Sequence, residues 1–271
     1  MSFLEVNNLN VEFNTADGIV RAVNKVSFSL EEGKILAIVG ESGSGKSATA
    51  LATLGLLPAN ATVDGEILFE GENVCTMNSK QLQSIRGKKI AMVFQEPMTS
   101  LNPVFSIGEQ IMETMLAHES LTRREAKRRT IIALEEVGID KNRVHSYPHE
   151  FSGGMRQRVV IAIALACKPK LLIADEPTTA LDATTSVQII ELLKELQLKR
   201  GMAIIFITHD LCIVPSIAEQ LCVMREGSIV ESGKTEAVLH TPIHPYTAAI
   251  TACVPSIHKK MARLPTVEEF L

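Results

Sequence analysis

The sequence has no long hydrophobic run. Its longest apolar stretch, "VVIAIALAC" at 159–167, falls well short of the roughly 18 residues that a membrane-spanning helix needs. The first residues, "MSFLEVNNLNVEF", have neither the basic segment nor the apolar segment of a secretory signal peptide. We therefore expect neither a transmembrane helix nor a signal peptide.

Paired cysteines and an excess of basic charge are missing as well. The five cysteines form no CxxC pair, which favours reduced thiols in a cytosolic protein over disulfides or a metal site. The formal net charge is -4, so the composition does not favour binding to nucleic acid. The basic run "TRREAKRR" at 122–129 is interpreted as the solvated face of a helix. With 46% hydrophobic and 21% charged residues, the chain is typical of a globular protein.

The sequence does have a pattern of short strands and helices. Strands are predicted near the start, and the helical run "ATALATLGLL" precedes the last of them; the predicted strands are 3–13, 22–30, 35–40 and 65–71. Residues from about 96 to 166 have the apolar spacing of helices instead. Strands and helices then alternate again through "KLLIADEP", "SVQIIELLKELQLKR", "AIIFITHD", "SIAEQLCVM" (a helix or a helix–strand edge) and "GSIVESG" (a hairpin arm). The pattern predicts an α/β core with an inserted helical lobe, followed by an irregular or short-helical segment from Thr241.

The stretch "GESGSGKS", Gly40 to Ser47, fits the pattern G-x-x-x-x-G-K-[ST] between a predicted strand and a predicted helix. Its glycines let backbone N–H groups converge on phosphate oxygens, and the helix N-terminus adds partial positive charge. Lys46 can then reach the β- and γ-phosphates of a nucleotide, and the Ser47 hydroxyl can bind Mg²⁺. Because the flanking elements fit, we favour a nucleotide site over a Gly/Ser loop without a ligand.

Two carboxylates, Asp175 and Glu176, follow the apolar run "LLIA". Ligands bind at the C-terminal ends of parallel strands, so Asp175 can hold Mg²⁺ directly or through water. Glu176 lies where a base for an attacking water is useful. The phosphate-binding loop makes this interpretation stronger than a pair of surface or capping carboxylates. His209 ends another apolar strand and can contact a γ-phosphate there, although a lone histidine is more often structural.

A second glycine-rich stretch, "FSGGMRQR" at 151–158, precedes the apolar helix "RVVIAIALA". It predicts a second anion-binding helix terminus. One nucleotide does not need two helix N-termini from opposite ends of one domain. In a pair of protomers, however, the second helix N-terminus of each protomer can bind the ATP held by the other. A simple turn before a helix is the alternative when these glycines are considered alone.

Taken together, these motifs resemble the ATP-binding subunit of ATP-binding-cassette (ABC) transporters. "GESGSGKS" resembles Walker A, "FSGGM" the family signature, "LLIADE" Walker B, "TALD" the D-loop and "THD" the H-switch, and Gln95 in "VFQEP" resembles the Q-loop glutamine. The resemblance implies a P-loop ATPase core with a mixed sheet, an antiparallel β subdomain and an inserted α-helical subdomain. The implied ATPase domain covers residues 1–253, with the helical insert at about 96–166 and a short tail at 254–271.

The resemblance also implies a role for each matching position. Glu176 would polarise the water, His209 would bind the γ-phosphate, and Lys46 would complete the catalytic set. Gln95 would bind the metal and sense the transmembrane subunit. The residues expected to bind Mg²⁺ are Ser47, Gln95 and Asp175.

Other positions would bind ATP or couple two sites. The signature residues Ser152, Gly153, Gly154 and Met155 would face the partner's ATP in a head-to-tail dimer, and Asp182 would couple the two sites. Phe13 is the best match to the aromatic residue that stacks on adenine, and it fits the core equally well. The expected ATP-binding residues are Phe13, Gly40, Glu41, Ser42, Gly43, Ser44, Gly45, Lys46, Ser47, Ala48, Thr49 and Gln95.

The sequence departs from the family pattern in two places. The signature has Met155 where the family usually has Gln, and Phe151 where it usually has Leu. Ala48, followed by Thr49, stands where a threonine often follows Walker A. Neither departure removes Glu176, so we expect a site that hydrolyses ATP.

"VFQEPMTSLNPVFSIGEQI", "YPHEFSGGMRQRV" and "HPYTAAI" resemble the dipeptide, oligopeptide and nickel importer subfamily. Membership implies two transmembrane permease subunits, a second ATP-binding subunit different from this one, and an extracytoplasmic substrate-binding protein, with this chain peripheral on the cytoplasmic face of the inner membrane. Peptides are the favoured cargo, and nickel or a metal–chelator complex is the alternative. The tail contains only Cys253, which does not support the iron–sulfur site that many members carry there.

Two other classes of function fit the sequence less well. A soluble ABC ATPase of DNA repair or translation would show a long coiled-coil insertion, two cassettes or a basic stripe, and the sequence has none of these. A regulatory subunit that does not hydrolyse ATP is disfavoured because Glu176 and His209 are both present.

Overall fold

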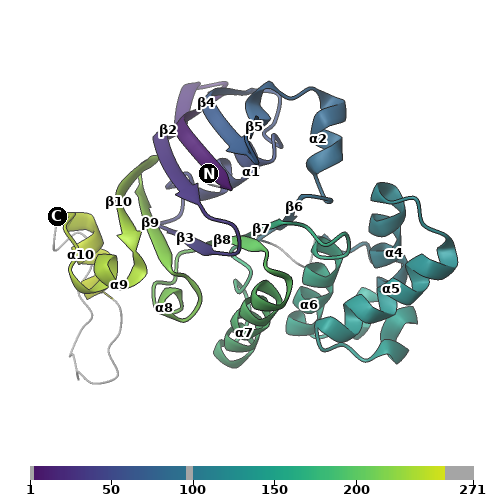
Figure 1. Ribbon diagram of the computed structural model, residues 1–271. Coiled ribbons are helices and arrows are strands. Elements are labelled where there is room, and N and C mark those ends of the chain that lie inside the picture. The colour runs from purple at the N-terminus through teal and green to yellow at the C-terminus, as the bar shows by residue number, and fades with distance from the viewer. Residues whose placement is uncertain (1–2, 96–99, 254–271) are drawn as a thin grey trace. The chain divides into compact units, whose positions relative to one another are not determined.

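The computed structural model describes residues 3–95 and 100–253. The predicted start of the helical insert at Glu96 and the predicted tail at 254–271 therefore lie outside the described residues. The described chain divides into two compact units (Figure 1). The first comprises residues 3–30, 34–75 and 206–253, and the second comprises residues 31–33, 76–95 and 100–205.

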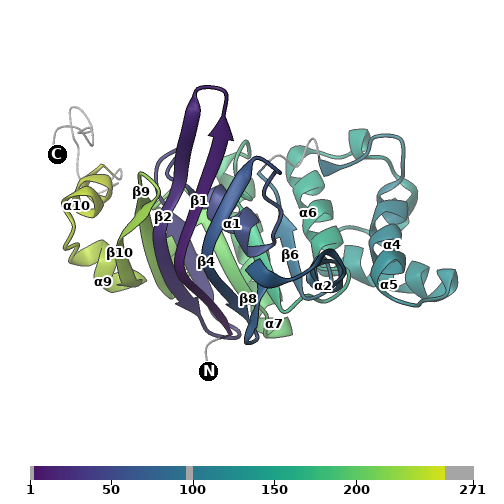
Figure 2. The same ribbon diagram turned by 90° about the horizontal axis from the view of Figure 1, so that it is seen from above.

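The first unit contains a four-stranded antiparallel sheet in the order β2-β1-β4-β5. Its strands are β1 (Leu4–Thr15), β2 (Gly18–Leu30), β4 (Ala61–Phe69) and β5 (Glu72–Asn73). Along β1, Leu4 and Val6 are buried, and so are Leu9 and Val11 after the register shifts by a bulge. Figure 2 shows β1 and β2 as a long hairpin whose tip extends beyond β4. The antiparallel subdomain implied by the family resemblance is confirmed.

Three further strands of the first unit form a mixed arrangement. β9 (Gln220–Arg225) runs parallel to β3 (Ile35–Val39) and antiparallel to β10 (Ser228–Lys234). All five residues of β3 are buried, as expected for a strand covered on both faces. The helices of this unit are α1 (Lys46–Thr53), α8 (Val214–Ile217), α9 (Thr235–His240) and α10 (Pro245–Ala252). α9 and α10 lie beside β10 (Figure 1).

The sequence expectations for this part are confirmed in outline. The segment 216–224, read as a helix or a helix–strand edge, contains the end of α8 and most of β9. The segment after Thr241 contains the short helix α10. β8 (Ala203–Thr208) crosses the division between the units, which falls after Ile205.

The second unit is mainly helical around two strands. β6 (Ile90–Val93) and β7 (Leu171–Asp175) pair in parallel, with Ile90 opposite Leu171. The helices are α2 (Ser79–Ile85), α4 (Ile107–His118), α5 (Arg123–Glu136), α6 (Gly153–Ala164) and α7 (Ala183–Arg200), with short 3-10 turns at Lys141–His145 and Pro148–Glu150. Because β6 and β7 are neighbours, the predicted helical insert is the crossover between them. The sequence pattern did not predict β6 or α2.

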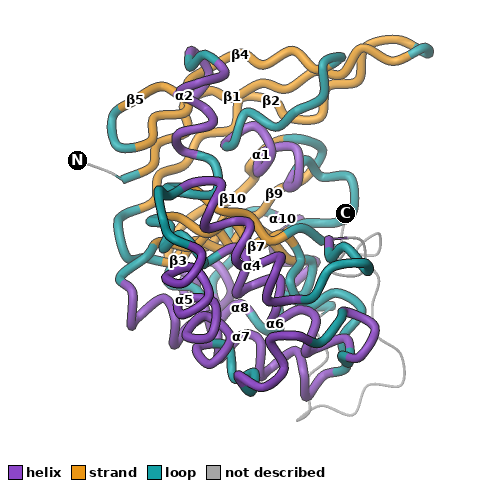
Figure 3. Tube along the Cα trace, turned by 90° about the vertical axis from the view of Figure 1, so that its right-hand side faces the viewer, coloured by secondary structure: helices purple, strands orange, loops and turns teal. Residues whose placement is uncertain are grey.

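Helices α4, α5 and α6 contact one another and appear as adjacent tubes in Figure 3. The basic run at 122–129 lies at the start of α5, and the prediction of a fully solvated face is wrong at Arg129. Its guanidinium forms a two-point ion pair with Glu119, with Nη2 2.8 Å from one carboxylate oxygen, and donates to the Ala166 carbonyl at 3.1 Å. The Arg129 side chain is only 18% exposed, so it ties α5 to the loop after α6.

None of the helices within residues 3–95 and 100–253 is long and apolar enough to span a bilayer.

Candidate active site

The loop Gly40 to Ser47 connects β3 to α1 in the first unit, as the motif predicts. The Lys46 side chain is buried, and its ammonium donates to the carbonyls of Gly40 and Glu41 at 2.8 Å each. The ammonium is therefore held over the loop and not extended into solvent. A fixed cation enclosed by a ring of backbone groups is suited to polyphosphate.

The glycines of this loop are required by its geometry. A Cβ on Gly40 would lie 2.2 Å from the carbonyl oxygen of Met224 in β9, which no real side chain tolerates. Gly43 and Gly45 have φ of 80° and 99°, the left-handed region that favours glycine. A Cβ on Gly45 would also lie 2.4 Å from the carbonyl of Ala22. The loop is thus a tight turn pressed against its neighbouring strands.

Behind the loop, α1 begins at Lys46, with the Ser47 side chain exposed in its first turn. Ala48 is half-buried. The hydroxyl of the buried Thr49 donates to the carbonyl of Gly45 at 3.0 Å, which ties the first turn of α1 to the loop. Ligation of phosphate by Ala48 and Thr49 stays a prediction.

The second unit holds the carboxylate pair. Asp175 ends β7 and is 4% exposed, and Glu176 follows it directly. Glu176 has a φ of 46°, a conformation that costs a non-glycine residue about 1–3 kcal/mol and recurs at functional sites. Its carboxylate accepts hydrogen bonds from Gln95 Nε2 at 3.0 Å and from the Thr179 hydroxyl at 2.8 Å.

Two residues that the sequence analysis singled out separately, Gln95 and Glu176, are therefore in direct contact. Thr179, the first residue of the "TALD" segment, was not singled out, although it lies three residues after Glu176. Together the two donors fix the direction in which the carboxylate points. Such orientation by neighbouring groups is what a general base requires.

The signature stretch lies at the start of α6. Ser152 is its N-cap, and its hydroxyl oxygen accepts from the Met155 N–H at 3.4 Å. A Cβ on Gly154 would lie 2.3 Å from Cγ2 of Thr185, whereas a Cβ on Gly153 would lie at an ordinary 3.5 Å from Leu181. The second glycine is thus required by packing within this chain.

Asp182 caps α7 and completes this cluster. It accepts from the Thr185 N–H at 2.9 Å and from the Thr185 hydroxyl at 2.6 Å, and these hydrogen bonds hold the pKa of Asp182 below its usual range. Thr185 therefore contacts both Gly154 of the signature and Asp182 of the D-loop segment. Only the fold reveals this, because Thr185 has no motif of its own in the sequence.

Phe151, which replaces the family's usual leucine, is buried below the signature. The guanidinium of Arg143 lies over its ring, with Cζ 4.5 Å from the ring centroid, and the Arg143 Nη2 donates to the carbonyl of Glu150. The larger ring is accommodated by a cation–π contact that the sequence analysis did not foresee.

His209 and Phe13 belong to the first unit. His209 follows β8 and is exposed, and the turn after it is fixed by hydrogen bonds from Asp210 N to the Thr208 hydroxyl and from Cys212 N to the Asp210 carboxylate. Phe13 is half-buried on β1, opposite Val20 and Ala61. The contacts of His209 with γ-phosphate and of Phe13 with adenine stay predictions.

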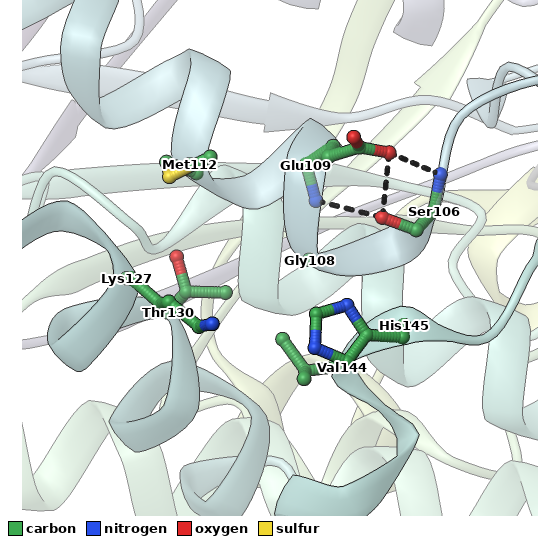
Figure 4. Close-up of a pocket in the computed structure, with 8 residues that line it drawn as sticks. All are labelled: Ser106, Gly108, Glu109, Met112, Lys127, Thr130, Val144 and His145. Atoms are coloured by element: carbon green, nitrogen blue, oxygen red, sulfur yellow. Dashed lines mark hydrogen bonds between the residues drawn. The ribbon is translucent and has the colours of Figure 1, made fainter. Parts of the chain in front are cut away.

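A separate cavity of about 170 Å³ lies in the helical insert (Figure 4). It is lined by Ser106, Gly108, Glu109, Met112, Lys127, Thr130, Val144 and His145. Glu109 faces Ser106 and is hydrogen-bonded to both its N–H and its hydroxyl. Ser106, Gly108 and Glu109 belong to the stretch "VFQEPMTSLNPVFSIGEQI", and none of the lining residues is assigned above to ATP or Mg²⁺ binding.

The comparisons with known proteins agree with these motifs. The ABC transporter family matches residues 23–179, and the family described as the C-terminal region of oligopeptide/dipeptide transporters matches residues 230–269. The oligopeptide transport ATP-binding protein OppD of Bacillus subtilis (strain 168) is 52% identical over 258 residues, which cover 94% of this chain and 72% of that protein. The dipeptide transport ATP-binding protein DppD of Lactococcus lactis subsp. cremoris (strain MG1363) is 48% identical over 268 residues, covering 97% and 77%.

A solved structure supports the same relationship. The dimeric post-hydrolysis state of the ATP-binding cassette MJ0796, bound to ADP and Pi, matches with a TM-score of 0.76 at 27% identity, over 86% of this chain and 98% of that one. The α/β fold with an antiparallel sheet and a helical insert is thereby confirmed as that of an ABC cassette. The chain therefore belongs to the ABC transporter family, as one of its ATP-binding and ATP-hydrolysing subunits.

Proposed function

We propose that this subunit energises the import of dipeptides or oligopeptides. The observation that carries the choice of cargo is the match of residues 230–269 to the C-terminal region of oligopeptide/dipeptide transporters, beside relatives named for the same cargo. A nickel or metal–chelator importer is the alternative that the experiment below separates. Residues 1–253 form the ATPase domain in this proposal, with the helical insert at about 96–166 and the tail at 254–271.

Binding of ATP begins at the phosphate-binding loop. The Lys46 ammonium, already held at the loop by two carbonyls, neutralises phosphate charge, while the backbone N–H groups of Gly43 to Ser47 and the start of α1 donate to phosphate oxygens. Phe13 stacks on the adenine. Glu41, Ser42 and Ala48 complete the loop around the phosphates.

The residues present fit Mg²⁺ because they offer hard oxygen ligands. A hydroxyl, a buried carboxylate and an amide oxygen are donors that Mg²⁺ prefers, and they come from Ser47, Asp175 and Gln95. These residues would hold the Mg²⁺, which would supply positive charge to stabilise the transferred phosphate.

Hydrolysis is assigned to Glu176. Its carboxylate is held by Gln95 and Thr179, so it can accept a hydrogen bond from one water and direct that water's oxygen at the γ-phosphorus. The water's oxygen bonds to phosphorus while its proton passes to the Glu176 carboxylate, the bond between phosphorus and the ADP oxygen breaks, and the products are ADP and inorganic phosphate. His209 donates to the γ-phosphate oxygens during this step.

The signature acts on a second protomer. Ser152, Gly153, Gly154 and Met155 face the ATP of a head-to-tail partner, and Asp182 couples the two sites. We propose a second and different ATP-binding subunit, two transmembrane permeases and an extracytoplasmic substrate-binding protein as partners, with this chain on the cytoplasmic face of the inner membrane. ATP binding closes the dimer, hydrolysis reopens it, and the helical insert passes the motion to the permease.

Co-purification from native membranes tests this proposal. A tag on this chain, followed by mass spectrometry, should recover two permeases, a second ATPase and a binding protein. The ligand carried by that binding protein then decides between peptide and metal cargo. Recovery of the chain without any membrane protein would overturn the transport role.

A further inference from the structure

The segment "HPYT", His244 to Thr247, has no part in the mechanism described above. It forms the start of α10, and Tyr246 within it is 1% exposed. The phenol hydroxyl is buried, and the backbone of Glu41 in the phosphate-binding loop interacts with it without closing a hydrogen bond of good geometry. A buried polar group without a well-formed hydrogen bond calls for an explanation, so the contacts of the ring are informative.

The ring of Tyr246 makes a cation–π contact. The guanidinium of Arg225, the last residue of β9, lies over it with Cζ 5.0 Å from the ring centroid. The Arg225 side chain also bonds Glu226 through Nε at 3.2 Å, so two groups fix its position. Burial raises the pKa of Tyr246 and the charge of Glu41 in the phosphate-binding loop acts in the same direction, whereas the Glu41 backbone and the charge of Arg225 act against it.

The turn that follows Arg225 contacts the phosphate-binding loop. Glu226 and Gly227 have φ of 48° and 80°, the pair of positive values typical of a two-residue hairpin turn. The Gly227 N–H donates to the carbonyl of Ser44 at 3.1 Å, and its own carbonyl accepts from Asn24 N at 2.8 Å. The turn therefore joins the loop to β2.

The residue before Arg225 reaches the loop as well. The Met224 carbonyl occupies the space that a Cβ on Gly40 would need, and the Met224 Cε lies 3.3 Å from the Cβ position of Gly45. Met224 and Gly227, which flank Arg225 and Glu226 in this hairpin, thus contact Gly40, Ser44 and Gly45 of the loop. Their positions depend on the hairpin being held still.

α10 is attached to the same hairpin through β10. The carboxylate of Glu231 on β10 accepts from the N–H groups of Ile243 and His244 at 2.9 and 3.0 Å. His244 in turn caps α10, with Nδ1 accepting from Tyr246 N at 3.1 Å. The hairpin is therefore held by α10 at β10 and again at Arg225.

We propose that Tyr246 is a positioning residue for ATP binding. Through the stacked Arg225, it steadies the β9–β10 turn against which the phosphate-binding loop rests. The inference deepens, and rests on, the ATP-driven function proposed above. It gives the C-terminal family region, residues 230–269, a direct influence on the nucleotide site.

The test compares KM and kcat for ATP in the purified transporter complex. Tyr246→Leu removes the ring but keeps a buried side chain. We expect KM to rise about 5-fold with kcat little changed, because a displaced phosphate-binding loop weakens ATP binding and leaves the hydrolysis step unaffected. Tyr246→Phe keeps the ring and should have the KM of the wild type. Arg225→Gln should raise KM similarly, and the double variant should be no worse than either single one.

Val238→Ala is the matched control. Val238 is buried in α9 of the same C-terminal part, so its truncation lowers the thermal stability of this region without touching Arg225. A purely structural role for Tyr246 would make Tyr246→Leu behave like this control, with a lower Tm, less active protein and an unchanged KM, and would overturn the proposal. Additive effects of the two single variants on KM would overturn the path through Arg225. A wild-type complex without ATPase activity would instead overturn the proposed function, and the positioning role would fall with it.

Discussion

Gly154→Ala isolates the contact between the signature and the D-loop segment. The new Cβ would lie 2.3 Å from Cγ2 of Thr185. Thr185 cannot simply rotate away, because both its N–H and its hydroxyl are bonded to Asp182 at 2.9 and 2.6 Å. Overpacking of this kind costs about 1–3 kcal/mol, and we expect the free energy of unfolding of the full chain to fall by that amount.

Thr185→Ser should relieve the clash. It removes the methyl group that the new Cβ would meet and keeps the hydroxyl that caps α7 through Asp182. Alone it should cost less than about 0.8 kcal/mol, the value of a fully buried methylene, because Thr185 is only half-buried. In the double variant the penalty of Gly154→Ala should largely disappear, a non-additivity expected of residues in contact.

Gly153→Ala supplies the control on the neighbouring residue. Its Cβ would lie 3.5 Å from Leu181, an ordinary contact, so the same substitution should leave stability within about 0.5 kcal/mol of the wild type. Urea unfolding followed by far-UV circular dichroism measures all four proteins. The reasoning would be refuted by equal stability of the two alanine variants, or by a double variant no more stable than Gly154→Ala.

Three further outcomes are expected. Glu176→Gln should lower the ATPase rate at least about 100-fold and leave the Kd for ATP near that of the wild type, and a retained rate would contradict its assignment as the base. Gly40→Ala should abolish nucleotide binding, because its Cβ would lie 2.2 Å from the Met224 carbonyl oxygen. A fluorescent ATP analogue measures this binding, and a Kd within about 2-fold of the wild-type value would be incompatible with that packing. Glu119→Gln should cost about 1 kcal/mol at pH 7. The hydrogen bond from Arg129 lowers the pKa of Glu119, so the difference in unfolding free energy between the wild type and Glu119→Gln should be complete above about pH 5. This difference should shrink as the pH falls below the ordinary carboxyl pKa of 4.5. A difference that stays constant down to about pH 3 would argue against the ion pair.

The sequence predicts the elements that carry chemistry because each has a local pattern. Lys46 follows a glycine loop between an apolar strand and a helix, and Glu176 follows an apolar strand, so their places on the fold are confirmed. The helical insert was visible from its spacing alone. The contact between Gln95 and Glu176 joins residues 81 apart in the chain and follows only from the family resemblance or the structure.

The parts that escaped prediction lack a local signal. β6 has four residues, too short for a periodic pattern to stand out. Thr185 and Tyr246 act through partners distant in sequence or through packing, so nothing next to them in the chain indicates their contacts. The sequence pattern predicts the same solvated environment for Arg129 as for the basic residues beside it. In the structure Arg129 instead pairs with Glu119, which lies at the end of the preceding helix.

The parallel pairing of β6 with β7 has a consequence for how the chain folds. The whole helical insert separates the two strands, and closing so long a loop is slow unless the insert has already become compact. Helices α4, α5 and α6 make their contacts over shorter stretches of chain, so they are expected to form first and bring β6 and β7 within reach of each other. During synthesis β6 is therefore unpaired until β7 has been made. Lys88 and Lys89, directly before this apolar strand, are the kind of charged flank that keeps a waiting strand from pairing with another chain.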